Sequence, residues 1–186
     1  MSDLVDDIKN ALSSVVSGVG DVVSTTQNIA RENVIKAAQG VGDITTSGIG
    51  AVTNVIDSGI QAVSSTGASL TDGVTGLVRG AVDGAKDVGV DTAQAAGEAA
   101  STAIKTTFRV GGDLGEVAVS SVRGALQAAE DIGGDSGLLA KEAVLGTINA
   151  ADEIGSEAGG LVRKALLNAA ALPHDIIDAL LTGKTD

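Results

Sequence analysis

The chain has 186 residues, 44% of them hydrophobic, and a formal net charge of −12 at pH 7. This charge argues against nucleic acid as a partner, because such binding needs Lys and Arg to neutralise phosphates, and it disfavours anionic membranes. Phe108 is the single aromatic residue, so the large side chains that hold an ordinary core, at about 1.5–3 kcal/mol each, are mostly replaced by small ones.

The N-terminal segment MSDLVDDIKN is acidic where a signal peptide would be basic, and no apolar segment follows it. The chain has no Cys, which excludes disulfides and thiolate metal sites. No run of 18 residues is both strongly apolar and free of charge, so we expect no transmembrane helix. The expected location is the cytoplasm, with peripheral attachment to a lipid droplet, granule or membrane.

An eleven-residue repeat runs through the chain from Ile8 to Val162. Apolar residues occupy a few adjacent registers and polar residues the others, a segregation at about 3.67 residues per turn that predicts amphipathic helix. The apolar registers form a stripe that we expect to face lipid or a partner: Ile8, Val19, Val41, Ile44, Val52, Val55, Val63, Val74, Leu77, Val88, Ile132, Ile154 and Val162.

Blocks of 22 residues also align along the chain, beginning with residues 12–33 and 34–55. A unit of this size cannot bury its own apolar face, so it predicts an assembly of stacked units. We expect a continuous repeat region over residues 1–172. Because proline breaks a helix, Pro173 separates it from a short amphipathic segment over residues 173–186.

The 26 glycines oppose a single isolated helix, since each costs about 0.8–1 kcal/mol relative to alanine. The predicted fold is therefore all-α, with long amphipathic helices in an elongated or bundled arrangement. The alternative fold is a β-solenoid. Three glycine pairs spaced by 22 residues predict notches for helix packing: Gly111 and Gly115, Gly133 and Gly137, Gly155 and Gly159. Drift within a duplicated unit explains the same spacing. The two GVGD segments, at residues 18–21 and 40–43, alternatively predict turns between shorter helices.

No motif indicates catalysis. The segment GGDSGLL around Ser136 is superficially similar to the nucleophile loop of trypsin-like proteases, but the only histidine, His174, lies beside the single proline. His174 is better interpreted as a solvated residue at a helix start, and the scattered acidic residues as a solvated face. We therefore predict that the protein is not an enzyme and uses no metal or cofactor.

The periodicity resembles that of synucleins, perilipins, exchangeable apolipoproteins and late-embryogenesis-abundant proteins, and the composition resembles that of phasins. The synuclein KTKEGV core and the lysine flanks of lipid-binding repeats are absent. The resemblance implies a non-catalytic coat on a neutral rather than anionic lipid or storage-granule surface. The alternative is a self-assembling structural protein, a homo-oligomer forming a helical bundle or filament. A third hypothesis is a stress-protective protein.

Overall fold

The structure, a computed structural model, describes residues 2–15, 21–40 and 44–182. In this part of the chain it forms nine α-helices and no strand, which confirms the all-α prediction and makes the β-solenoid alternative wrong. The helices are α1 (Ser2–Ser14), α2 (Val22–Gln39), α3 (Ile44–Thr66), α4 (Leu70–Asp87), α5 (Thr92–Val110), α6 (Leu114–Ile132), α7 (Ser136–Ile154), α8 (Ser156–Asn168) and α9 (His174–Thr182).

From α4 to α7, each 22-residue unit is one helix and one turn. The residues that cap the helix N-termini follow this spacing, because a Ser or Asp side chain accepts a hydrogen bond from a free amide of the first turn. These caps are Ser69, Asp91, Asp113 and Asp135. Two residues before each cap lies a glycine with φ between 65° and 78°, a left-handed conformation that glycine adopts without strain: Gly67, Gly89, Gly111 and Gly133.

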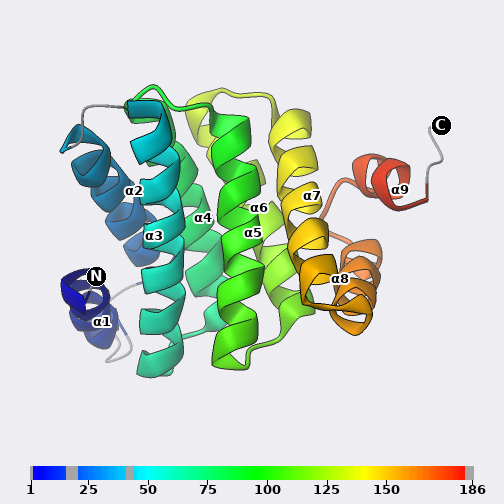
Figure 1. Cartoon of the computed structure of the whole chain (residues 1–186), viewed down its shortest axis with the longest axis horizontal. Helices are drawn as coiled ribbons and strands as arrows, with labels where there is room; N and C mark the ends of the chain where they lie inside the picture. Colours follow the sequence, from blue (N-terminus) through cyan, green and yellow to red (C-terminus); the bar gives the residue numbers. More distant parts are fainter. Residues whose placement is uncertain (1, 16–20, 41–43, 183–186) are drawn as a thin grey trace.

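The helices lie in two layers, and consecutive helices alternate between them (Figure 1). In one layer α3 packs on α5 and α5 on α7, and in the other α2 packs on α4 and α4 on α6. The short helices α1 and α8 with α9 lie at opposite ends of this stack (Figure 1). Neighbours within a layer are therefore two units apart in sequence, so the structural repeat is a pair of 22-residue units.

Glycine lets α4 approach α2 closely. Three glycines of α4, one turn apart, face the backbone of α2: Gly76 faces Val23, Gly80 faces Gln27 and Gly84 faces Arg31. The two residue numbers advance together, so α2 and α4 run parallel. A Cβ on Gly80 would collide with the carbonyl oxygen of Gln27, and the small-xxx-small spacing therefore sets how near the two helices lie.

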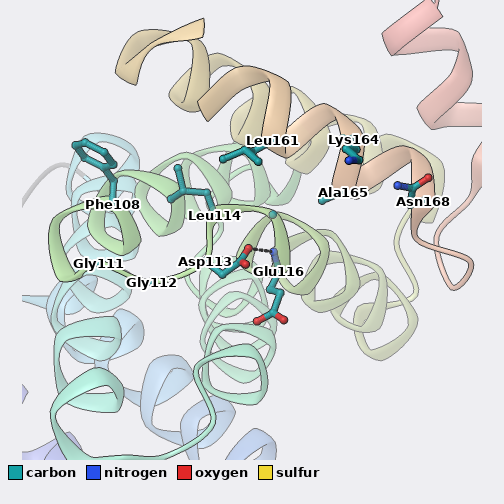
Figure 2. A pocket seen from close by; sticks show the side chains of 11 residues that line it. Phe108, Gly111, Gly112, Asp113, Leu114, Glu116, Leu161, Lys164, Ala165 and Asn168 are labelled. Atoms are coloured by element: carbon teal, nitrogen blue, oxygen red, sulfur yellow. Dashed lines mark hydrogen bonds between the residues drawn. The ribbon is translucent and has the colours of Figure 1, made fainter. Parts of the chain in front are cut away.

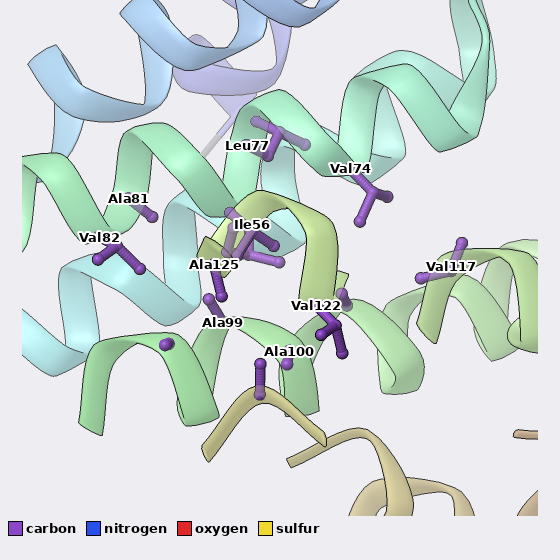
Figure 3. Close-up of a cluster of buried hydrophobic side chains, with 14 of the residues drawn as sticks. Ile56, Val74, Leu77, Ala81, Val82, Ala99, Ala100, Val117, Val122 and Ala125 are labelled. Carbon is purple, nitrogen blue, oxygen red and sulfur yellow. The ribbon is translucent and has the colours of Figure 1, made fainter. Parts of the chain in front are cut away.

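The core fills the space between the layers with small and branched side chains. Figure 3 shows Ile56 of α3, Leu77 of α4, Ala99 of α5 and Val122 of α6 in one cluster. The inner face of α5 is built largely from fully buried alanines at positions 95, 96, 99, 100 and 103. Tight helix spacing thus compensates for the scarcity of large residues, because protein interiors keep one packing density whatever the side-chain size.

Candidate functional site

Most of the predicted stripe lies inside the chain's own fold. Seven of its residues are at most 1% exposed and belong to the core: Ile8, Val52, Val55, Val63, Val74, Leu77 and Val162. The sequence pattern predicts that these residues face lipid or a partner, and other helices of the same chain cover them instead. Exposure of these side chains to lipid or to another molecule would require the two layers to separate.

The remaining stripe residues differ from this group. Val88, Ile132 and Ile154 lie at helix C-termini and are half-buried. Val19 and Val41 lie outside the described residues, as does the side chain of Ile44. The GVGD segments also lie largely outside them, although Asp21 caps the N-terminus of α2.

The glycine pairs are not uniform notches, and the structure corrects that interpretation. Gly111, Gly133 and Gly155 end helices, and a Cβ on any of them would meet nothing within 4 Å. Gly115 does permit a close contact, since its Cβ would lie 2.9 Å from that of Ala165 on α8. A Cβ on Gly137 would approach α9, and one on Gly159 would meet Asp152 and Arg163. The close approach of α2 to α4 depends instead on Gly76, Gly80 and Gly84.

The candidate site begins at the end of α5, where Phe108 is 57% exposed. The neighbouring Thr106 and Thr107 point inward and are fully buried, so helical geometry turns Phe108 outward. The chain then reverses at Gly111, whose left-handed conformation allows the Gly112 amide to donate to the Thr107 carbonyl oxygen. Asp113 accepts a hydrogen bond from the Glu116 amide and starts α6 (Figure 2).

Helix α8 passes above this turn and completes a groove, here called the α8 groove (Figure 2). Its middle is a hollow of about 620 Å³ beside Phe108, Leu114 and Leu161. A second hollow of about 530 Å³ shares these three residues and extends to Glu157 near the start of α8. A third, of about 340 Å³, continues past Ala165 toward the end of α8 and Arg123. Leu161 is 54% exposed, so the middle of the groove presents apolar surface to solvent.

The groove carries charge at both ends and in its middle. Glu157 lines one end and Arg123 the other, while Glu116 and Lys164 line the middle. All four side chains are exposed, and within the described residues none of them takes part in an ion pair. Elsewhere in this acidic chain six Lys and Arg residues do pair with carboxylates. The exposed surface of the groove thus carries both signs of charge.

A second polar feature joins α2, α4 and α6. Asp83 of α4 is 7% exposed, and its Oδ2 accepts from Gln27 Nε2 at 2.9 Å while its Oδ1 has no partner among the described residues. Burial raises the pKa of Asp83, and the nearby Asp131 adds to the shift. Arg79 donates two hydrogen bonds to Asp131, at 2.5 and 2.8 Å, and this pairing lowers the pKa of Asp131. Three helices of one layer are therefore tied together by one network.

No catalytic arrangement is visible in the described part of the chain. Ser136 and His174 are the exposed first residues of α7 and α9, and within the described residues no hydrogen bond joins their side chains. No group of three or more His, Asp or Glu side chains in this part is placed to hold a metal ion.

Sequence reasoning singles out Phe108 only as the lone aromatic residue and misses the groove. The groove depends on the placement of α8 over the turn between α5 and α6, a contact between segments about 50 residues apart. A usable signal is present, since Phe108, the single aromatic residue, falls in the same eleven-residue register as Lys9, Arg31 and Lys86, which is a polar register.

Within the described residues, no helix has the length and apolarity needed to span a membrane. A scan against protein-family models finds no family that matches this chain, and a search of curated proteins finds none that matches it.

Proposed function

We propose that this chain is a non-catalytic helical-repeat structural protein that works by association through the α8 groove. One observation carries the proposal: the single aromatic side chain is 57% exposed at the mouth of an apolar hollow, beside an exposed leucine. Burial of Phe108 in the core would stabilise the fold by about 1.5–3 kcal/mol. Because Phe108 is exposed, the fold lacks this stabilisation. Exposed apolar clusters with a polar rim are typical of interaction sites.

The two-layer repeat supports this proposal. It satisfies the apolar faces of the helices within one chain, so the inner stripe needs no external cover. An external partner would therefore bind the outer surface of the molecule. In the described part of the chain four large apolar residues are exposed, and two of them, Phe108 and Leu161, lie in the α8 groove.

An apolar fluorescent dye such as bis-ANS tests the groove directly, since such dyes report exposed hydrophobic surface. We expect Leu161→Ser and Phe108→Ser each to remove most of the dye bound by the folded protein. Leu167→Ser is the matched control, because Leu167 lies on the same helix and is 38% exposed but does not line the groove. Equal dye binding by the wild type and all three variants would contradict the proposal.

A second candidate function is a coat on a neutral lipid or granule surface. The observation that favours it is the burial of the Val, Ala and Leu stripe on the inner faces of linked amphipathic helices, which could exchange contacts with each other for contacts with lipid. A peripheral cytoplasmic location belongs to this proposal.

Flotation with neutral-lipid emulsions, combined with hydrogen exchange, tests the coat. If the layers open on lipid, the floated protein should keep its helix content while amides along α4 and α5 lose protection, because their tertiary contacts are gone. Protein that stays in the aqueous phase at all emulsion concentrations would rule the coat out.

A further inference from the structure

We propose that the α8 groove is occupied by the α8 groove of a second copy of this chain, in a two-fold symmetric dimer with the two α8 helices antiparallel. This inference rests on the proposed function and deepens it by naming the partner. A two-fold interface uses the same patch on both subunits, so the patch must be complementary to itself. The groove meets this requirement in shape and in charge.

The shape complementarity lies in the middle of the groove. Phe108 projects beside a hollow of about 620 Å³ that its own side chain leaves open (Figure 2). A two-fold axis through this region brings Phe108 of each copy over the hollow of the other. Leu161 of both copies then flanks the axis, and two exposed apolar clusters are removed from water together. Aromatic anchors in central pockets carry most of the binding energy of many interfaces.

The charge complementarity lies at the ends of the groove. Helix α8 has 13 residues and is therefore about 20 Å long. Glu157 lies at one end of the groove and Arg123 at the other. An antiparallel arrangement places Glu157 of one copy against Arg123 of the second copy, and the reverse, so two ion pairs form across the dimer. A parallel arrangement would place like charges together.

These charges also favour a second copy over other partners. The chain as a whole carries −12, so two copies repel each other at long range, and only the local pairing of opposite charges in the groove attracts them. A basic partner would be attracted to the whole acidic surface and would not need the groove. Glu116, Glu157, Lys164 and Arg123, which make no ion pair within the described residues, suit a partner that presents the same mixture in reverse order.

Sedimentation equilibrium of the full chain is the main experiment. Because two chains that each carry −12 repel each other, we expect reversible dimerisation within about 1 µM to 1 mM. Leu161→Ser and Phe108→Ser should each weaken the dimer by about 30-fold or more. Leu167→Ser should leave the dimerisation constant unchanged.

A charge exchange tests the antiparallel arrangement. Glu157→Arg alone and Arg123→Glu alone should each weaken self-association by about tenfold, because each places like charges together twice. An equimolar mixture of the two variants should associate as the wild type does, since the mixed dimer restores two oppositely charged pairs where each variant alone has two repulsive ones. The double variant E157R/R123E should also dimerise. Both positions are exposed, and recovery on mixing cannot come from altered folding.

The outcomes separate this inference from the proposed function. A wild-type chain that stays monomeric at about 1 mM, while Leu161→Ser still removes dye binding, would overturn the second copy and leave the groove as a docking surface. A dimer unaffected by Leu161→Ser and Phe108→Ser, or a mixture that fails to recover, overturns the proposed arrangement. Phe108-dependent flotation of a monomer with lipid emulsion would replace the second copy by a lipid surface.

Discussion

At the scale of single residues, the ionised forms of two aspartates in one network have opposite effects on the free energy of unfolding. Asp83 is buried, and its charged form is disfavoured there, whereas Asp131 is held in its charged form by Arg79. Both contact Gln27 Nε2, at 2.9 and 3.3 Å. The same amide group therefore bridges a carboxylate that favours protonation and one that favours ionisation, and the two should respond to pH in opposite ways.

We expect Asp83→Asn to stabilise the fold by about 1 kcal/mol at pH 7, because an amide keeps an acceptor for Gln27 without the desolvation of a charge. The folded-state pKa of Asp83 is raised, so its contribution favours folding below the ordinary aspartate value and is lost as pH rises through the raised value. The difference in the free energy of unfolding between Asp83→Asn and the wild type should therefore shrink as the pH falls toward 3, about one unit below the ordinary pKa of aspartate.

The counterpart is Asp131→Asn, whose effect should have the other sign. The folded-state pKa of Asp131 is lowered, so its stabilising contribution is present above the ordinary aspartate value and is lost as pH falls through the lowered value. We expect destabilisation by about 1 kcal/mol at pH 7, since a partly exposed ion pair is worth little more. Urea unfolding of both variants at several pH values measures the two slopes, and slopes of equal sign would contradict this assignment.

At the scale of helices, glycine has two roles that one sequence pattern does not distinguish. Gly80 faces the backbone of α2, whereas Gly50 lies on the exposed side of α3, where an added Cβ would meet nothing within 4 Å. Both occupy helix interiors, where glycine by itself costs about 1 kcal/mol relative to alanine. Close packing of Gly80 against α2 offsets this helix-propensity cost, whereas Gly50 has no packing partner that would offset it.

The same substitution should thus have opposite effects at the two positions. Gly80→Ala should destabilise the protein by about 1–3 kcal/mol, because the methyl group would meet the carbonyl oxygen of Gln27 and force α2 away. Gly50→Ala should stabilise it by about 1 kcal/mol through helix propensity. Thermal or urea unfolding of both variants is sufficient. Stabilisation by Gly80→Ala would mean that α2 and α4 are not in close contact.

The helices themselves are predictable from the sequence, and their ends are readable in principle. The eleven-residue segregation indicates amphipathic helix because it reflects a local geometric rule that needs no knowledge of neighbours. The turns carry a local signal too, a glycine followed two residues later by a capping side chain, as in Gly111 with Asp113. The prediction of a packing notch at Gly111 is wrong because spacing alone does not distinguish a helix end from a helix contact.

At the scale of the whole molecule, order should decline from the middle of the stack toward its ends. Helices α4 and α6 each pack against several other helices, while α9 contacts α7 and α8 in the described structure and has one fully buried side chain, Ile177. In repeat architectures stability comes from contacts between neighbouring units, so terminal units have less of it.

Native-state hydrogen exchange should show this gradient. We expect amides of α1 and α9 to exchange by local opening, and those of α4 and α6 to exchange only at rates set by global unfolding. Mass spectrometry of peptides from each helix, at pH 7 and low denaturant, gives the comparison. Equal protection along the chain would instead indicate one fully cooperative unit.

The layered arrangement and the groove are beyond sequence reasoning for one physical reason. The stripe shows that each helix has something to bury, as at Val52 or Leu77, but the identity of the covering surface is a long-range property. Lipid, another copy and another part of the same chain satisfy an apolar face equally well. The groove is harder still, since it exists only where α8 lies over the turn that follows Phe108.

The alternation of consecutive helices between two layers makes the parity of the repeat count matter. Insertion of one 22-residue unit ahead of α5 would transfer every later helix to the opposite layer and bring unlike inner faces together. Insertion of two units would return each later helix to its own layer and leave α8 above the same turn. Growth or shortening of this chain by duplication is therefore compatible with its fold in steps of two units.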